Sequence, residues 1–283
     1  MSNYHNDSNI FVKDVVLKVE NLNRSIEFYK SIMGLKVIKE MEKEAILSAD
    51  GVHPIVTLIQ PENIIPKIPR RTGLYHIAIL LPNRIQLGLF LKNIRDKRYP
   101  IVGGSHHGVS EAVYLEDPDD NGIEVYVDTP ESTWDINNDE INMVTEMLDY
   151  EDLMESTGNQ SWSGAPKDTI IGHIHLHVAD LDESNKFYNA LGFDLKLSMK
   201  NSAYFLSTGG YHHHIGLNVW NGKGAAPLPE NSVGMKYYTL LFSAEATRAE
   251  KIKNIEDLGY SVSEIDNELF TKDPSENVIK LII

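Results

Sequence analysis

Three histidines alternate with aliphatic residues just beyond the middle of the chain. Ile174 and Leu176 separate His173, His175 and His177, and this period of two is typical of a β-strand with one imidazole face and one aliphatic face. Imidazoles bind divalent metals and transfer protons near neutral pH. Because three imidazoles cannot pack as an ordinary apolar core, we expect this face to line a polar cavity where the protein carries out its chemistry.

A helix is expected directly after this strand. Residues 185–191 carry a short helical pattern, Asp180 or Asp182 can cap its N-terminus, and Gly192 ends it. The strand and the helix together would hold the imidazole face in place.

The same succession occurs earlier in the chain. Asp14 lies in the first copy where His173 lies in the second, and a Phe-Tyr pair follows each at the same distance. Each copy continues with three short apolar runs, at 35–39, 45–49 and 55–59 in the first and at 194–198, 203–207 and 214–220 in the second. The repeating unit is therefore a strand, a helix and three strands.

Two further units follow these copies, which gives four βαβββ units and an α+β fold class. One starts at Gly73 and has a helix from Asn83 to about Arg98; the other starts at Gly234 and has a helix near 246–258. The polar stretch 129–168, with one helical candidate at 149–156, reads as a connection. We therefore predict a pair of units over 10–128, a linker with a short helix over 129–168, and a second pair over 169–283.

The repeat identifies three residues at equivalent inward positions. His76 and His173 occupy matching places in the first strands of units two and three, and Glu124 lies in the last strand of unit two. Two histidines and one carboxylate are the ligand set of non-haem Fe(II) oxygenases. In units one and four the matching positions hold Asp14, Tyr237 and Lys280, which together could not assemble a divalent-cation site.

The three ligands converge only if unit two packs beside unit three, which leaves units one and four to pair. The rival pairing of units one and two would bring Asp14 to His76 and Glu124, and would leave the imidazole face of unit three without a partner. We favour the first pairing, in which one sheet forms a cup for a metal and the other cup is filled.

Several motifs resemble a known superfamily. They are the Gly-His start of unit three, the sequence Asp117-Pro118-Asp119-Asp120-Asn121-Gly122-Ile123-Glu124, and the runs 73–76, 109–115 and 210–218. With the four units they make the chain similar to the vicinal oxygen chelate superfamily, and more narrowly to the bacillus-type catechol 2,3-dioxygenases among the extradiol ring-cleaving enzymes. The fold implied is that of the glyoxalase, bleomycin-resistance and extradiol dioxygenase proteins, with two mixed-sheet cups.

The resemblance implies roles for particular residues. His76, His173 and Glu124 match the metal ligands, His214 matches the pocket acid/base histidine, and Tyr114 matches the pocket tyrosine beside the substrate. A further pocket histidine matches His107. The remaining residues that we expect to line the substrate pocket are His175, His177, His213 and Asn218.

The implied activity is Fe(II)-dependent extradiol (meta) cleavage of a small aromatic diol with O2, giving a muconic semialdehyde in aromatic catabolism, with Mn(II) as the alternative ion. Two other functions stay open. A glyoxalase-type lyase or isomerase would need a fourth protein ligand, such as His214 or Asn218. A non-catalytic small-molecule or antibiotic-binding protein is disfavoured because all three ligand positions are filled.

Composition and net charge limit the classes of partner that we expect the protein to bind. The 283 residues carry a formal charge of −15 and no cysteine, so neither nucleic acid nor an anionic membrane is expected as a partner, and any metal must be held by histidine and carboxylate. Residues 1–13 hold no apolar segment and nothing approaches a membrane span. We expect a cytoplasmic protein, for which a homo-oligomeric assembly is left open.

Overall fold

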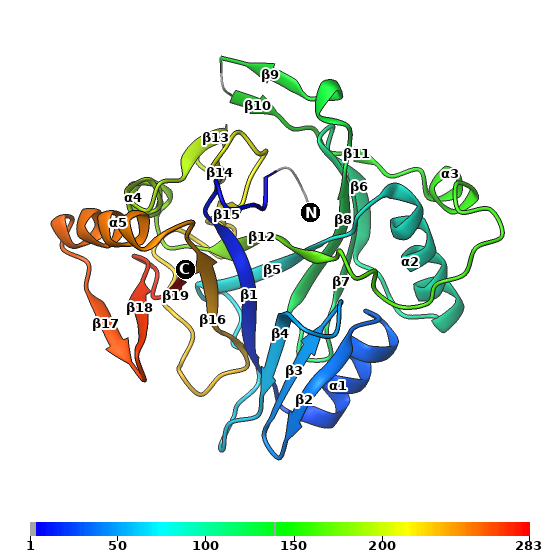
Figure 1. The fold of residues 1–283 in the computed structure, drawn as a ribbon, viewed down its shortest axis with the longest axis horizontal. Coiled ribbons are helices and arrows are strands. Elements are labelled where there is room, and N and C mark those ends of the chain that lie inside the picture. The colour runs from blue at the N-terminus through cyan, green and yellow to red at the C-terminus, as the bar shows by residue number, and fades with distance from the viewer. Residues whose placement is uncertain (1–3, 139) are drawn as a thin grey trace.

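The chain folds into four repeats of one unit, joined in the middle by a connecting segment (Figure 1). The computed structural model describes residues 4–138 and 140–283. The first unit comprises β1 (Phe11–Lys18), α1 (Leu22–Ser31), β2 (Lys36–Met41), β3 (Glu44–Ser48) and β4 (Pro54–Ile59). The second comprises β5 (Gly73–Leu80), α2 (Arg84–Lys97), β6 (Gly103–His106), β7 (Ser110–Glu116) and β8 (Gly122–Asp128).

The second half repeats this order. The third unit comprises β12 (Ile170–His177), α4 (Leu181–Ala190), β13 (Asp194–Met199), β14 (Ala203–Ser207) and β15 (Ile215–Asn218). The fourth comprises β16 (Gly234–Leu241), α5 (Glu245–Asp257), β17 (Val262–Ile265), β18 (Glu268–Lys272) and β19 (Val278–Ile282). The predicted four βαβββ units are confirmed.

Within the described residues, the strands form two large mixed sheets and one separate hairpin. The first sheet has the order β17-β18-β19-β16-β1-β4-β3-β2, and the second β11-β6-β7-β8-β5-β12-β15-β14-β13. β5 pairs antiparallel with β12, and β1 with β16. The favoured pairing of unit two with three, and of one with four, is confirmed. Each sheet therefore takes one unit from residues 10–128 and one from 169–283.

The period of two along β12 separates the two faces of that strand. Ile174 and Leu176 are fully buried in an apolar cluster that also contains Leu17 and Tyr238 of the other sheet. The histidines of the same strand point away from this cluster. The burial of aliphatic side chains between the sheets thus fixes the orientation of the imidazole face.

Side-chain caps fix where three of the helices begin. The side chains of Asn21, Asn83 and Asp180 accept hydrogen bonds from backbone N–H groups in the first turns of α1, α2 and α4. Of the two expected caps of α4, the structure uses Asp180, and the helix begins earlier than the predicted 185. Gly192 follows α4 with φ 102°, a left-handed conformation that glycine adopts without strain.

A buried tyrosine in α1 and one in α4 each hold a turn of the next unit. Tyr29 donates to Asp117 Oδ2 at 3.2 Å in the turn before β8, and Tyr188 donates to Asp273 Oδ2 at 3.1 Å in the turn before β19. Each aspartate also accepts from the backbone N–H and the side chain of the asparagine four residues on. The turns are therefore rigid and lock unit one to two and unit three to four.

The connecting segment is more ordered than a linker. It comprises the 3₁₀ turn Glu131–Thr133, β9 (Asp135–Asn137), β10 (Glu140–Asn142), β11 (Glu146–Met147) and α3 (Tyr150–Glu155). β11 pairs with β6 at one edge of the second sheet, while β10 contacts β13 at the opposite edge. The segment therefore crosses the open side of this cup. The predicted helix over 149–156 is present, and the three short strands were not predicted.

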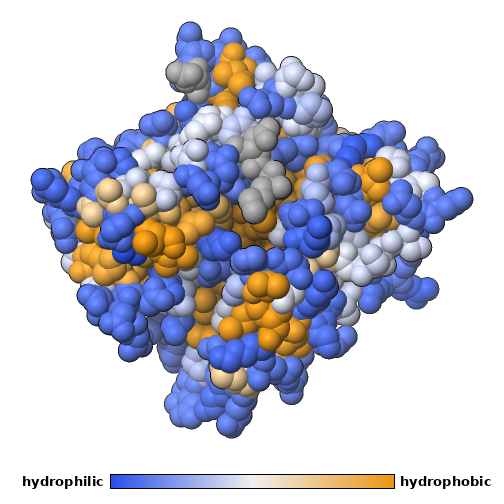
Figure 2. Space-filling model, viewed as in Figure 1, coloured by the Kyte–Doolittle hydropathy of each residue, from blue (hydrophilic) through white to orange (hydrophobic). Residues whose placement is uncertain are grey.

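Figure 2 shows hydrophilic residues over most of the face in view, interrupted by apolar patches. None of the helices in the described parts of the chain combines the length and apolar character needed to cross a membrane.

Candidate metal centre

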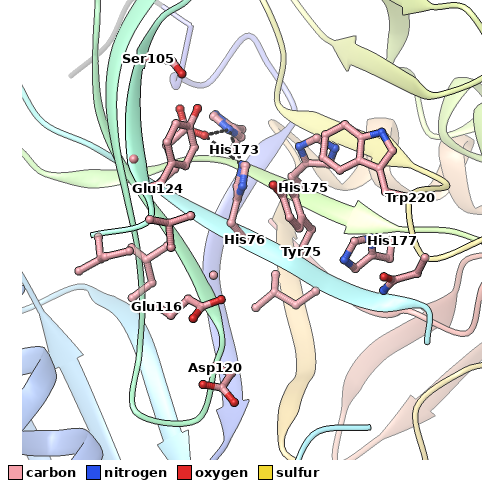
Figure 3. A pocket seen from close by; sticks show the side chains of 18 of the residues that line it. Tyr75, His76, Ser105, Glu116, Asp120, Glu124, His173, His175, His177 and Trp220 are labelled. Atoms are coloured by element: carbon pink, nitrogen blue, oxygen red, sulfur yellow. Dashed lines mark hydrogen bonds and ion pairs between the residues drawn. The ribbon is translucent and has the colours of Figure 1, made fainter. Parts of the chain in front are cut away.

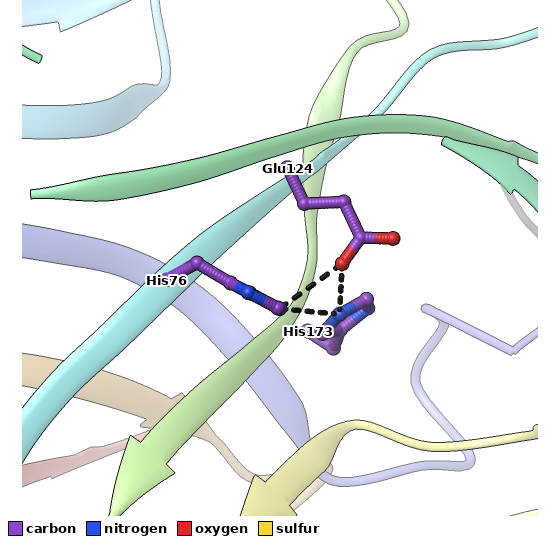
Figure 4. A group of neighbouring side chains, drawn as sticks. All are labelled: His76, Glu124 and His173. Atoms are coloured by element: carbon purple, nitrogen blue, oxygen red, sulfur yellow. Dashed lines mark hydrogen bonds and ion pairs between the residues drawn. The ribbon is translucent and has the colours of Figure 1, made fainter. Parts of the chain in front are cut away.

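Two histidines and a glutamate from three adjacent strands meet on the inner face of the second sheet (Figure 4). Glu124 Oε2 lies 3.0 Å from His76 Nε2 and 3.2 Å from His173 Nε2, and the two Nε2 atoms are 3.4 Å apart. All three side chains are buried. The structure thus brings together the three residues that the sequence repeat singled out.

The sheet register explains why these three side chains meet. Ala78 of β5 lies opposite Glu124 of β8 on one side and opposite His173 of β12 on the other. Residues directly opposite in a sheet share a face, and His76 lies two residues from Ala78 on the same strand, so it shares that face as well. The small side chain of Ala78 leaves room between its three larger neighbours.

The trio fits a divalent ion. Ligand atoms about 2.1 Å from one octahedral ion are about 3 Å apart at adjacent corners, which agrees with the three separations here. Burial alone would favour the neutral acid at Glu124, but the two imidazoles hold the pKa of its carboxyl well below the usual range. Burial lowers the pKa of His173 to about 4. A carboxylate and neutral imidazoles are the forms that bind metal.

The first sheet has no such site at the equivalent position. Its register places Thr239 where Ala78 lies, with Asp14 opposite on one side and Lys280 on the other. Thr239 donates a hydrogen bond to Asp14, and Lys280 forms an ion pair with Glu268. An ammonium group and a threonine occupy the space that the second sheet leaves for an ion.

The trio forms part of the wall of a cavity of about 820 Å³ (Figure 3). Tyr75 packs edge-on against His175, and its ring centroid is 5.0 Å from that of Trp220. Residues 143–145 of the connecting segment line the cavity as well. The cavity is therefore bounded by aromatic rings on one side and by the connecting segment on another.

Tyr114 and His107, both predicted pocket residues, line this cavity and contact each other. His107 Nδ1 lies 2.7 Å from the carbonyl oxygen of Val144, which can only accept, so Nδ1 carries the proton of the neutral ring. His107 Nε2 then accepts from the hydroxyl of Tyr114 at 2.8 Å. Burial, with the nearby carboxylate of Glu124, raises the pKa of Tyr114 well above its ordinary value, so the phenol keeps its proton.

The structure corrects the assignment of His214. Within the described chain His213, not His214, lines the cavity, and its ring lies 4.0 Å from that of His173. His214 is fully buried elsewhere, where its Nδ1 accepts from the backbone N–H of Thr208 and its ring packs against His5. The prediction assumed that β15 starts at residue 214. The strand starts at Ile215, so the alternation of faces does not extend back to residues 212–214.

Of the remaining predicted pocket residues, two line the cavity and one lies behind it. His175 and His177 line the cavity. Asn218 lies behind His177, whose Nδ1 it contacts through Oδ1 at 2.7 Å, and it does not itself reach the cavity among the residues described. His107 lies in the lining of the cavity, whereas the adjacent His106 is not among the described lining residues.

Sequence reasoning missed some residues around the site. Tyr75 and Trp220 line the cavity although neither was assigned a role, and Val144 lies in a segment read as a linker. Asp128 and His212 were not assigned a role, although they contact each other at 3.0 Å behind His213. Their only sequence signal is the run of three histidines at 212–214.

A family model described as the Glyoxalase/Bleomycin resistance protein/Dioxygenase superfamily matches residues 12–125. A catechol-2,3-dioxygenase from Bacillus subtilis (strain 168) is 42% identical over 280 residues, which are 97% of this chain and 96% of that protein.

Two further relatives resemble this chain more distantly. A biphenyl-2,3-diol 1,2-dioxygenase from Rhodococcus globerulus is 30% identical over 129 residues, 42% of this chain and 66% of that protein. The crystal structure of glyoxalase I from Zea mays aligns with a TM-score of 0.58 at 18% identity, covering 96% of this chain and 92% of that one. This last likeness is one of fold.

Proposed function

The chain belongs to the Glyoxalase/Bleomycin resistance protein/Dioxygenase superfamily as an enzyme of extradiol dioxygenase type, and we propose that it catalyses Fe(II)-dependent meta cleavage of a catechol-type diol with O2 to a muconic semialdehyde. One observation carries the proposal: a buried trio of two histidines and one glutamate on the wall of a large cavity. This ligand set is the facial arrangement used by non-haem iron oxygenases.

His76, His173 and Glu124 would hold the ion, with Mn(II) as the alternative to Fe(II). The ion, when bound, would supply open coordination positions for a diol and O2. The single carboxylate of Glu124 would offset only part of the charge of the ion. The proposed ligands therefore account for binding of both reactants.

The protein's own part in the reaction is to manage protons and to orient the ring. His213 Nε2 would accept a proton as the diol binds and return it when the ring opens, since His213 lines the cavity beside the trio. The hydroxyl of Tyr114, fixed by His107, would position an oxygen of the substrate. Tyr75 and Trp220 would limit where the ring can lie.

The glyoxalase-type alternative is disfavoured by the same geometry. It requires a fourth protein ligand, for which His214 and Asn218 were the candidates. Both are fully buried, and neither reaches the cavity within the described residues. The site therefore offers three ligands, as a ring-cleaving enzyme needs, rather than four.

Anaerobic purification with Fe(II), metal analysis and an oxygen electrode test the proposed function. The protein should bind one iron per chain and consume O2 when catechol is added, and mass spectrometry should find a product that equals catechol plus O2. His76→Ala should abolish both the iron and the uptake, whereas His106→Ala, outside the cavity, should keep them. An iron-loaded parent without catechol-dependent uptake would refute the proposal.

A further inference from the structure

A chain of three side chains leads from the cavity wall into the protein behind the metal trio. His213 Nδ1 lies 2.8 Å from His212 Nδ1, and His212 Nε2 lies 3.0 Å from Asp128 Oδ1. The ring of His212 is fully buried. Asp128, at the far end, lines a second cavity of about 340 Å³. The three residues form a continuous line of hydrogen bonds between the two cavities.

The hydrogen-bond partners determine which ring nitrogens carry protons. A carboxylate only accepts, so Asp128 requires a proton on His212 Nε2. In the neutral ring His212 Nδ1 is then an acceptor, and the 2.8 Å contact requires a proton on His213 Nδ1. A neutral imidazole carries one ring proton, so a proton on Nδ1 of His213 leaves none on Nε2. His213 Nε2 is therefore left with a lone pair.

Other contacts hold this line in place. Tyr211 donates to the same oxygen of Asp128 at 2.9 Å, and Tyr126 contacts Tyr211 through its hydroxyl at 2.8 Å. The ring of His212 lies 3.9 Å from that of Tyr211. Neither the carboxylate nor His212 can turn without breaking these contacts, so the protonation pattern is built into the fold.

We propose that His212, backed by Asp128, is a positioning residue that fixes His213 as the Nδ1–H tautomer and so presents an unprotonated Nε2 to the substrate. When Nε2 takes the diol proton, His213 becomes an imidazolium whose Nδ1–H already faces an acceptor. The Asp128 carboxylate lies beyond that acceptor and offsets the new charge. The proposal rests on the function proposed above, because it assigns His213 the base role.

The tautomers themselves can be measured without any activity. In metal-free protein labelled with 15N-histidine, long-range 1H–15N correlation spectra distinguish Nδ1–H from Nε2–H rings, and His212→Phe and His213→Phe assign the two signals. We expect His212 as Nε2–H and His213 as Nδ1–H. The opposite tautomer at either ring would overturn the proposal, whatever the fate of the ring-cleavage assignment.

Two variants connect the tautomer to turnover. His212→Phe keeps a ring against Tyr211 but removes the acceptor, so His213 should shift toward Nε2–H and kcat should fall on the order of 10²-fold, with iron content and KM little changed. His212→Asn returns an acceptor oxygen near the Nδ1 position and should recover most of that loss. His53→Phe, which removes an exposed histidine also bonded to an aspartate, is the control and should match the parent.

The outcomes separate a positioning role from a merely structural one. A role in packing alone predicts that phenylalanine is tolerated better than asparagine, the reverse of the expected order. Parent-like kcat in His212→Phe, or a loss that His212→Asn does not relieve, would overturn the positioning role. Failure of the parent to cleave catechol would refute the proposed function and leave the tautomer measurement to decide on its own.

Discussion

His213 and His214 are neighbours in sequence, yet their rings occupy different environments. His213→Phe should keep iron and lose kcat by about 10²–10⁴-fold, because the proton acceptor beside the trio is gone. His214→Phe should retain kcat and lose about 1–3 kcal/mol of unfolding free energy, because the buried N–H of Thr208 loses its acceptor. Stopped-flow turnover and urea denaturation of both variants check this pair. If instead His214→Phe lost kcat and His213→Phe retained it, His214 would be the acid/base histidine, as the resemblance implied.

Glu124 is the one charged member of the trio. Glu124→Gln preserves shape but removes the negative charge, so iron affinity should fall at least about tenfold, since ligands must be deprotonated to bind. Glu116→Gln, a carboxylate elsewhere on the cavity wall, serves as the matched control. Metal analysis after dialysis gives the answer, and equal iron content in the two variants would remove Glu124 from the ligand set.

At the scale of elements, the two tyrosine-to-aspartate bonds should stabilise the packing of helix against turn. Tyr188→Phe leaves buried Asp273 short of one donor and removes the partner of Tyr238, so the unfolding free energy should fall by about 1–3 kcal/mol. Tyr204→Phe removes a bond of similar length to exposed Asp182 and should cost much less. Urea denaturation compares them. Equal losses of unfolding free energy in the two variants would mean that the buried hydrogen bond stabilises the fold no more than the exposed one.

The elements show where sequence reasoning succeeds and where it stops. Helix caps and alternating strands depend on residues close in sequence, so α2 and β14 were predicted nearly to the residue. β6 (Gly103–His106) was not predicted, because glycine and histidine do not favour a strand and its formation depends on pairing with β7. The tertiary contact, rather than local propensity, decides such strands.

Prediction of the candidate site from the sequence was limited in the same way, because local patterns do not report tertiary contacts. The repeat located His76, His173 and Glu124, because equivalent positions in duplicated units are fixed by strand register. The side-chain direction at 212–214 depends on a bend before β15, which no periodic pattern reports. Roles that depend on the bend, such as those of His213 and His212, required the structure.

At the scale of the whole molecule, buried histidines should make the metal-free protein sensitive to acid. Burial lowers the pKa of His5 and His177 to about 4 and that of His214 well below its ordinary value. Between pH 6.5 and 4 the unfolded chain therefore binds more protons than the folded one, and stability falls as pH decreases. Each of these histidines lowers the free energy of unfolding by about 1.4 kcal/mol per pH unit, which is about 4 kcal/mol per unit for the three together.

Several carboxyls act in the opposite direction, because burial raises the pKa of Asp14, Asp117, Asp119 and Asp273. Burial raises the pKa of Asp273 to about 6, so its protonation in the folded state adds stability as pH falls below that value. Asp273 offsets about 1.4 kcal/mol per pH unit, about a third of the combined effect of the three histidines, so we expect the net trend to be a loss of stability. Urea denaturation at pH 7, 6 and 5 measures the slope of the unfolding free energy against pH. His5→Phe should reduce this slope by the equivalent of about one bound proton. A flat profile would contradict these pKa shifts.

The exchange of units between the two sheets has a consequence for synthesis on the ribosome. β5 ends at residue 80, and its partner β12 begins at residue 170, so one edge of β5 has no strand to pair with until the second half has been made. At about 5–20 residues per second this interval lasts roughly 5–20 s. During this time the nascent chain exposes an unpaired strand edge that carries one metal ligand. The proposed metal site can therefore form only after nearly two thirds of the chain has been translated.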